Sequence, residues 1–257
     1  MLSAGCKFVG SHRGVTEPGG ELVIAMSQRP PEMTADAGDP AWDGATVIRG
    51  LGLALHSPAW DQQPPTTVAL LWDRDYLYVR FTSTTSAEPV SPYGTQHDAK
   101  HYMGDVVEIF LDPVGDGRQY FEIQQSPAGG ILDQNTTLTA AANSDSEGRL
   151  LPQVLAKDYW PNLSYDMPGL RNASHYERHG DAWVWIADFA LPAKAVLKRV
   201  GESNFSPRTL RLNLVRYAHL AHPSDPNHAM IAMNWSPVKW GCPHQSPAAM
   251  RTIRLAQ

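Results

Sequence analysis

The chain has 257 residues, a formal net charge of −5 at pH 7 and no cluster of Lys and Arg. Phosphate binding needs concentrated basic side chains, so this composition disfavours nucleic acid as a partner. No apolar run approaches the ~20 residues that cross a bilayer, so we expect no transmembrane segment. The 21 Pro and 20 Gly residues suit many short strands joined by turns.

The first twenty residues are polar and glycine-rich and show no periodicity. We expect residues 1–20 to form an arm ahead of a single domain at 21–257. The opening MLSAGCKF lacks the charged and apolar segments of a signal peptide. Cys6 and Cys242 stand near opposite ends of the chain. A disulfide between them would pin the arm beside the C-terminal segment, and two free thiols are the alternative.

Alternating apolar and polar side chains predict strands in the first part of the domain. Residues 21–26, ELVIAM, form a short strand. Residues 66–71 and 76–81 predict a hairpin, because the WDRD sequence between them supplies charged turn residues. Residues 82–104 contain prolines, glycine and histidines and predict a loop.

Two strands joined by the acidic turn DPVGDG are expected next, within residues 105–130. Period-two alternation places Glu108 on one side of the first strand. On the second strand it places Tyr120, Glu122 and Gln124 on one side. These side chains could share a face that holds a polar ligand, and the alternative is an ordinary solvent-facing side of an antiparallel sheet.

The remaining sequence predicts further short strands and one helix. Residues 139–180 are rich in helix and strand breakers, and we expect them to form a long irregular insertion. A short helix is expected at 193–200, because Pro192 stands near its first turn. Many strands, turns and few helices together predict an all-β, antiparallel, jelly-roll-like β-sandwich. The further expected strands are 130–138, 183–189, 210–217, 230–235 and 251–255.

Six segments, in this order, resemble the family 9 carbohydrate-binding modules and the broader family-9-like (DOMON-like) domains of secreted bacterial proteins. That resemblance implies a β-sandwich, often with structural calcium, and a site that holds the reducing end of a glycan between two aromatic side chains. The segments are PEMTAD and DPAW at 31–42, VALLWD and LYV at 68–79, GDVVEIFLD at 104–112, WIADFALP at 185–192, RLNLVR at 211–216, and NWSP with HQSP at 234–247.

The resemblance also implies site residues. One clamp aromatic lies six residues before the strand glutamate, which gives Tyr102 before Glu108. The second lies near the C-terminus, where Trp235 is the best match and Trp240 is a rival. Where the family carries a polar residue, often Arg, on the next strand, this sequence has Glu122 or Gln124. The candidate ligand-binding residues are Tyr102, Glu108, Glu122, Gln124, Asn213, Arg216 and Trp235.

Carboxylates in the hairpin turn suggest a metal. Asp112 and Asp116 are oxygen ligands of the kind that calcium prefers, although charged turn residues need no ion. His97-Asp98 with His101, and His175 with His179, pair imidazoles four residues apart. That spacing suits a metal on a helix, and the alternative is exposed histidines.

The favoured function is a non-catalytic carbohydrate-binding domain, extracellular or periplasmic, alone or within a larger polysaccharide-degrading system. One alternative is a glycan hydrolase or lyase that uses Glu108 or a histidine as general acid or base. Another is a b-type haem domain, with His101 and Met103, or Met230 and Met233, as axial ligands. The spacing of these haem-ligand candidates is not diagnostic, and we expect haem to be absent.

Overall fold

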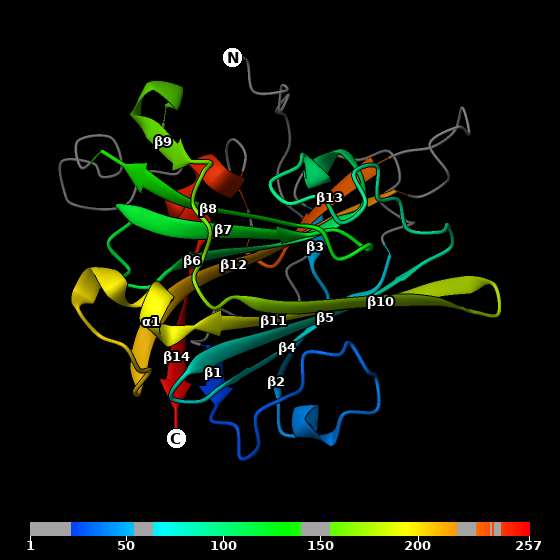
Figure 1. Ribbon diagram of the computed structural model, residues 1–257, viewed down its shortest axis with the longest axis horizontal. Coiled ribbons are helices and arrows are strands. Elements are labelled where there is room, and N and C mark those ends of the chain that lie inside the picture. The colour runs from blue at the N-terminus through cyan, green and yellow to red at the C-terminus, as the bar shows by residue number, and fades with distance from the viewer. Residues whose placement is uncertain (1–21, 54–63, 140–154, 220–229, 237, 239–242) are drawn as a thin grey trace.

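The computed structural model describes residues 22–53, 64–139, 155–219, 230–236, 238 and 243–257. Two β-sheets pack face to face (Figure 1). Sheet A has nine strands in the order β1-β14-β12-β6-β7-β8-β9, with β13 paired to both β12 and β3. Sheet B has five, in the order β10-β11-β5-β4-β2. The expected all-β sandwich is confirmed, and the predicted N-terminal arm, Cys6, Trp240 and Cys242 lie outside the described residues.

Most of the expected strands are present. All ladders are antiparallel except the parallel pair β1–β14. The strands are β1 (Leu22–Ala25), β2 (Thr46–Arg49), β3 (Gly52–Leu53), β4 (Thr66–Trp72), β5 (Tyr76–Thr85), β6 (Val106–Asp112), β7 (Gln119–Gln125), β8 (Ile131–Leu138), β9 (Tyr159–Asn162), β10 (Arg171–His179), β11 (Ala182–Pro192), β12 (Arg208–His219), β13 (Met230–Asn234) and β14 (Arg251–Ala256).

The main hydrophobic core lies between the two sheets. The strands that line this core supply every second side chain to it, because side chains of a strand alternate between its faces. On β6 these are Val107, Ile109 and Leu111, as the alternation predicts. The other large members include Trp72, Val79, Phe81, Phe121, Ile123, Trp185, Phe189, Leu210, Leu212, Leu214, Ile253 and Leu255.

Part of the expected irregular insertion is regular. Within residues 139–180, β9 extends sheet A, and β10 pairs along its whole length with β11. The sequence of β10, RNASHYERH, has no apolar alternation because the strand lies at the sheet edge and is mostly solvent-exposed. The expected helix is shorter than predicted: α1 (Ala193–Val196) is followed by a 3-10 turn that ends at Gly201 with φ 73°. No helix in the described ranges is long and apolar enough to cross a membrane.

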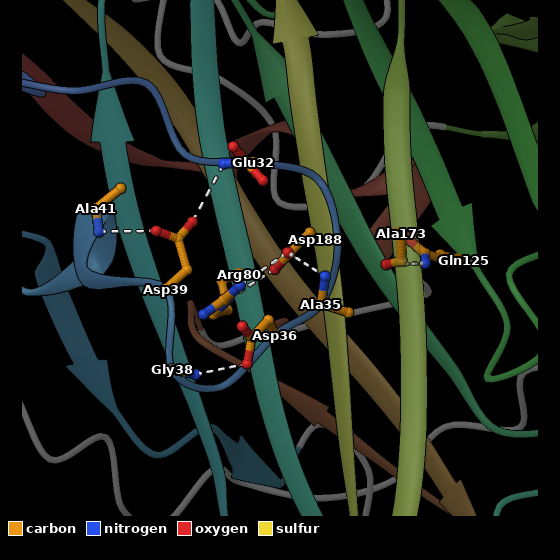
Figure 2. Close-up of polar contacts among 10 residues, drawn as sticks. All are labelled: Glu32, Ala35, Asp36, Gly38, Asp39, Ala41, Arg80, Gln125, Ala173 and Asp188. Carbon is orange, nitrogen blue, oxygen red and sulfur yellow. Dashed lines mark hydrogen bonds and ion pairs between the residues drawn. The ribbon is translucent and has the colours of Figure 1, made fainter.

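The chain before β2 covers the outer face of sheet B (Figure 2). The carboxylate of Asp188 accepts two hydrogen bonds from the Arg80 guanidinium, at 2.7 and 2.9 Å, and one from the Ala35 backbone N–H. Trp42 packs under the Arg80 guanidinium, 4.6 Å from it. These contacts cover that face with protein atoms at β5 and β11.

Candidate functional site

Polar side chains form two rows across the outer face of sheet A. Strand pairing places Asn234, Val215, Glu108 and Gln124 side by side on β13, β12, β6 and β7. The neighbouring row runs through Asn213, Phe110, Glu122 and Gln134 on β12, β6, β7 and β8. The two rows share one face, because their members are two residues apart along each strand. We call Glu108, Glu122, Gln124, Gln134 and Asn234 the polar cluster.

Glu122 lies at the centre of the polar cluster. Its carboxylate accepts one hydrogen bond from Gln124 Nε2, at 2.8 Å, and one from Gln134 Nε2, at 2.6 Å. All three side chains are at most 5% exposed. Because both amide nitrogens point to the carboxylate, the oxygens of both amides point elsewhere, and neither has a hydrogen-bond partner among the described residues.

Glu108 is the second buried carboxyl group of the polar cluster and is 3% exposed. Burial raises its pKa well above the usual range, and the negative charge of Glu122 raises it further. Burial also raises the pKa of Glu122, but the hydrogen bonds from Gln124 and Gln134 oppose that shift. Glu122 therefore holds negative charge more readily than Glu108 does.

Asn234 completes the row at β13. Its side chain is 2% exposed, and neither its Oδ1 nor its Nδ2 has a hydrogen-bond partner within the described ranges. Buried amides are nearly always hydrogen-bonded, so an unpaired one marks a place where water or a ligand is expected. Asn234 was not among the residues predicted from the sequence, which included the next residue, Trp235. The alternation in the β13 sequence MIAMN could have identified it. Ile231 and Met233 enter the core, so Asn234 points to the opposite face.

Aromatic side chains border the polar cluster on the β9 side. The Tyr120 hydroxyl donates to the backbone carbonyl of His244, and the rings of Tyr159 and His244 lie 5.3 Å apart. The segment before β14 therefore crosses the outer face of sheet A at β7 and β9 (Figure 1). Gln134 Nε2 also lies 3.5 Å from the Tyr159 hydroxyl. Gln134 and Tyr159 are further site residues that the sequence analysis missed, because it fixed neither the face of β8 nor the existence of β9.

Asn213 lies on the expected face, but its side-chain amide forms hydrogen bonds with the protein backbone. Its Nδ2 donates to the Ser236 carbonyl at 3.2 Å, and its Oδ1 accepts from the Ser236 N–H at 2.9 Å. Oδ1 also accepts from the Leu214 N–H at 2.9 Å. Asn213 thus anchors the chain where it leaves β13, and its amide is already satisfied.

Two predicted ligand residues, Arg216 and Trp235, point away from the polar cluster. Arg216 donates to Thr66 Oγ1 at 2.7 Å, on the first residue of β4 in the opposite sheet. It is 1% exposed, and burial lowers its pKa to about 10. Trp235 belongs to the main core, is 2% exposed, and has the Arg251 guanidinium 4.5 Å above its ring. Neither side chain lies on the outer face of sheet A, so the predicted pairing of Trp235 with Glu108 and Gln124 is wrong.

Tyr102 lies on the segment that leads into β6. It lies in the 3-10 turn His101–Met103, directly before β6, and its side chain is partly exposed. That turn packs against β7. The rival second aromatic, Trp240, lies outside the described residues, so the two-aromatic clamp stays a prediction.

The two carboxylates of the hairpin turn that were predicted to bind calcium make contacts with the protein. Asp112 Oδ1 accepts from the N–H groups of Val114 and Gly115, and its Oδ2 accepts from Gly117. Asp116 forms a salt bridge with Arg199. Burial alone would raise the pKa of Asp116, but the Arg199 guanidinium lowers it below the usual value. Both predicted calcium ligands therefore have partners within the folded chain, and the calcium ion stays a prediction.

The residues named for haem ligation are scattered. Met103 is 54% exposed, whereas His101 is fully buried, with Nε2 2.9 Å from the Gln96 carbonyl. Met230 is 46% exposed, whereas Met233 lies in the main core. In each pair one side chain is buried and the other is exposed.

Comparisons with known proteins agree with this architecture. Residues 35–153 match the model of the carbohydrate family 9 binding domain-like family. A solved structure of a candidate carbohydrate-binding protein from Bacteroides uniformis ATCC 8492 is similar, with a TM-score of 0.63 at 12% identity over 92% of this chain and 100% of that chain. No curated protein sequence shows significant similarity to the chain.

A family 9 carbohydrate-binding module from Caldicellulosiruptor kristjanssonii is also similar. Its glucose complex gives a TM-score of 0.51 at 16% identity, over 91% of this chain and 95% of that one. Its cellotriose complex gives 0.50 at 14% identity, over 92% and 93%. At these identities the likeness establishes the fold. The chain therefore has a β-sandwich fold like that of the family 9 module, and its residues 35–153 match the carbohydrate family 9 binding domain-like family.

Proposed function

We propose that the chain is a non-catalytic carbohydrate-binding domain and that the polar cluster on sheet A holds the sugar. The unpaired amide atoms of Gln124, Gln134 and Asn234 carry this proposal. Sugar hydroxyls both donate and accept hydrogen bonds, and they match a site that offers amide oxygens, an amide N–H group and two carboxyl groups. A buried polar group without a partner is unfavourable, so a hydroxylated ligand gains free energy by pairing with it.

The family pattern and the fold support the same ligand class. The neighbour from Caldicellulosiruptor kristjanssonii was solved with glucose and with cellotriose. We therefore propose a β-linked glucan, or the sugar at its end, as the first ligand to test. In this proposal Tyr102 stacks on the apolar face of a pyranose, as flat aromatic rings do.

A panel of soluble glycans tests the proposal. Affinity electrophoresis should retard the wild-type chain in at least one β-glucan and leave it unretarded in gels without polysaccharide. The Gln124→Ala variant should lose most of that retardation. The matched control is Gln119→Ala, a glutamine on the same strand but not on the face of the polar cluster. Retardation by no glycan, or equal retardation of both variants, would contradict the proposal.

A glycan-cleaving enzyme is the second candidate. One observation favours it: a buried carboxyl with a raised pKa, Glu108, lies near a second carboxylate, Glu122, as acid and base pairs in glycosidases do. Release of reducing sugar from a bound glucan, abolished in Glu108→Gln, would establish this reaction. Binding without product release would leave the domain non-catalytic.

We also propose that the chain acts outside the cytoplasm, extracellularly or in the periplasm, beside enzymes that degrade polysaccharide. This location follows from the proposed ligand, because polymeric glucans are met outside the cell. Fractionation of the native host, with antibody against the described domain, tests it. Recovery only in the cytoplasmic fraction would overturn this part of the proposal.

A further inference from the structure

Four metal-ligating side chains from three separate segments meet where the loop before β6 crosses the start of β8. The loop contributes His97 and Asp98, β8 contributes Asp133, and the chain between β9 and β10 contributes Asp166. One ligand atom from each residue lies within 4.8 Å of the other three. We call these four residues the His–Asp cluster.

The histidine is at the centre of the cluster. His97 Nδ1 lies 3.3 Å from Asp98 Oδ2 and 3.6 Å from Asp166 Oδ1. Its Nε2 lies 3.4 Å from Asp133 Oδ1. An ion with bonds of about 2.1 Å to nitrogen and oxygen separates neighbouring ligand atoms by roughly 3 to 3.5 Å. An imidazole binds one ion through one nitrogen, and the spacings at Nδ1 are close to this range for Asp98 and Asp166. Asp133 faces the other ring nitrogen and joins the set within the 4.8 Å that spans the four ligand atoms.

Asp133 directs into the cluster a buried carboxylate oxygen that has no hydrogen bond to any described residue. Its side chain is 2% exposed, and its Oδ2 accepts from the Met167 N–H. Its Oδ1 has no hydrogen bond within the part of the chain that the structure describes, and it points toward His97. A buried carboxylate with an unpaired oxygen is unfavourable. Two further carboxylates, Asp98 and Asp166, add like charge, and a single imidazolium would not balance the three.

The donor set indicates the class of ion. Calcium and magnesium prefer oxygen ligands, whereas an imidazole nitrogen beside carboxylates suits zinc and neighbouring transition metals. We propose that His97, Asp98, Asp133 and Asp166 bind a divalent transition-metal ion of the zinc type. This site differs from the hairpin turn of Asp112 and Asp116, and it is independent of the proposed sugar binding.

The ion would connect three parts of the chain that are distant in sequence. Asp98 also donates its backbone N–H to the Ile131 carbonyl, so the loop is held at β8 beside the cluster. His101 and Tyr102 follow on the same loop. Bound metal therefore stabilises the loop that carries Tyr102 and raises the melting temperature of the folded chain by mass action.

Isothermal titration of Zn²⁺ into the chelator-stripped, untagged full chain tests the site. We expect one ion per chain, at least tenfold tighter than Ca²⁺ or Mg²⁺ titrated in the same buffer. His97→Ala and Asp166→Asn, whose side chains are 53% and 76% exposed and do not support the fold, should each weaken Zn²⁺ binding at least tenfold. Both variants should also lose the rise in melting temperature that Zn²⁺ gives the wild-type chain.

The matched control is His179→Ala. His179 pairs with Glu177 at 2.8 Å on the exposed face of β10, which is a histidine–carboxylate contact outside the cluster. This variant should bind Zn²⁺ like the wild-type chain. Substoichiometric binding, Zn²⁺ affinity unchanged by His97→Ala and Asp166→Asn, or Ca²⁺ binding as tight as Zn²⁺ would each overturn the proposal.

Discussion

Asn213 holds Ser236 through both ends of its amide, with Nδ2 to the Ser236 carbonyl at 3.2 Å and Oδ1 to the Ser236 N–H at 2.9 Å. This contact fixes the chain at the point where it leaves β13 and turns over the outer face of sheet A. Asn234, two residues before Ser236 and the last residue of β13, is a member of the polar cluster. Asn213 therefore positions a cluster residue without contacting the ligand.

Replacing Asn213 with Ala should lower the free energy of unfolding by about 2–3 kcal/mol, because it leaves two buried backbone groups of Ser236 unpaired. Urea unfolding measures the loss. The control is Asn204→Ala, since the Asn204 side chain is exposed and bonds at the surface. A loss in Asn213→Ala no larger than in the control would show that the anchor contributes nothing.

Glu108 should make the stability of the ligand-free chain depend on pH. Its pKa is raised in the folded state, so the folded chain binds the proton more tightly than the unfolded chain does. This contribution to stability is complete below about pH 4.3, the unfolded pKa, and is lost as the pH rises through the folded pKa. Glu108→Gln removes that loss, and its melting temperature should exceed that of the wild-type chain at pH 8 but not at pH 4.

The control for this pH dependence is Glu88→Gln, because Glu88 is exposed on the loop before β6. Its melting curve should follow that of the wild-type chain at both pH values. Equal melting temperatures of the wild-type chain and Glu108→Gln at pH 8 would mean that Glu108 is not the unfavourably buried carboxyl.

The Arg80–Asp188 pair should stabilise the domain without affecting the site. Asp188→Asn leaves a guanidinium that is 6% exposed without its counter-ion, and loss of one partner from a buried pair typically lowers stability by about 3–5 kcal/mol. Urea unfolding of Asp188→Asn should show this drop. The surface pair Arg208–Glu202 offers the comparison, since Glu202→Gln should change stability by less than about 1 kcal/mol.

Strand periodicity predicted the centre of the site but not its outer parts. The alternation of β6 and β7 placed Glu108, Glu122 and Gln124 on one face, and the observed register agrees. The same alternation on β12 separates Asn213 from Arg216, which stand three residues apart and so point to opposite faces. The resemblance to family 9 modules named both residues because they lie in one matching segment, RLNLVR. A matching segment does not by itself say which face of the strand each side chain occupies.

The missed residues belong to elements with weak sequence signals. Gln134 joins the site only because the turn between β7 and β8 sets the register that pairs it with Glu122. Tyr159 joins through β9, a four-residue strand that contains a proline. The His–Asp cluster is composed by tertiary contact between segments about thirty residues apart, and no local spacing encodes it.

Calorimetric titration of cellotriose into the wild-type chain and into Glu122→Gln tests the central claim most directly. The wild-type chain should bind with measurable heat, and Glu122→Gln should bind at least tenfold more weakly, since charge-assisted hydrogen bonds contribute about 1.5–3 kcal/mol. A folded Glu122→Gln, verified by its melting curve, that binds cellotriose as tightly as the wild-type chain would contradict a sugar site in the polar cluster.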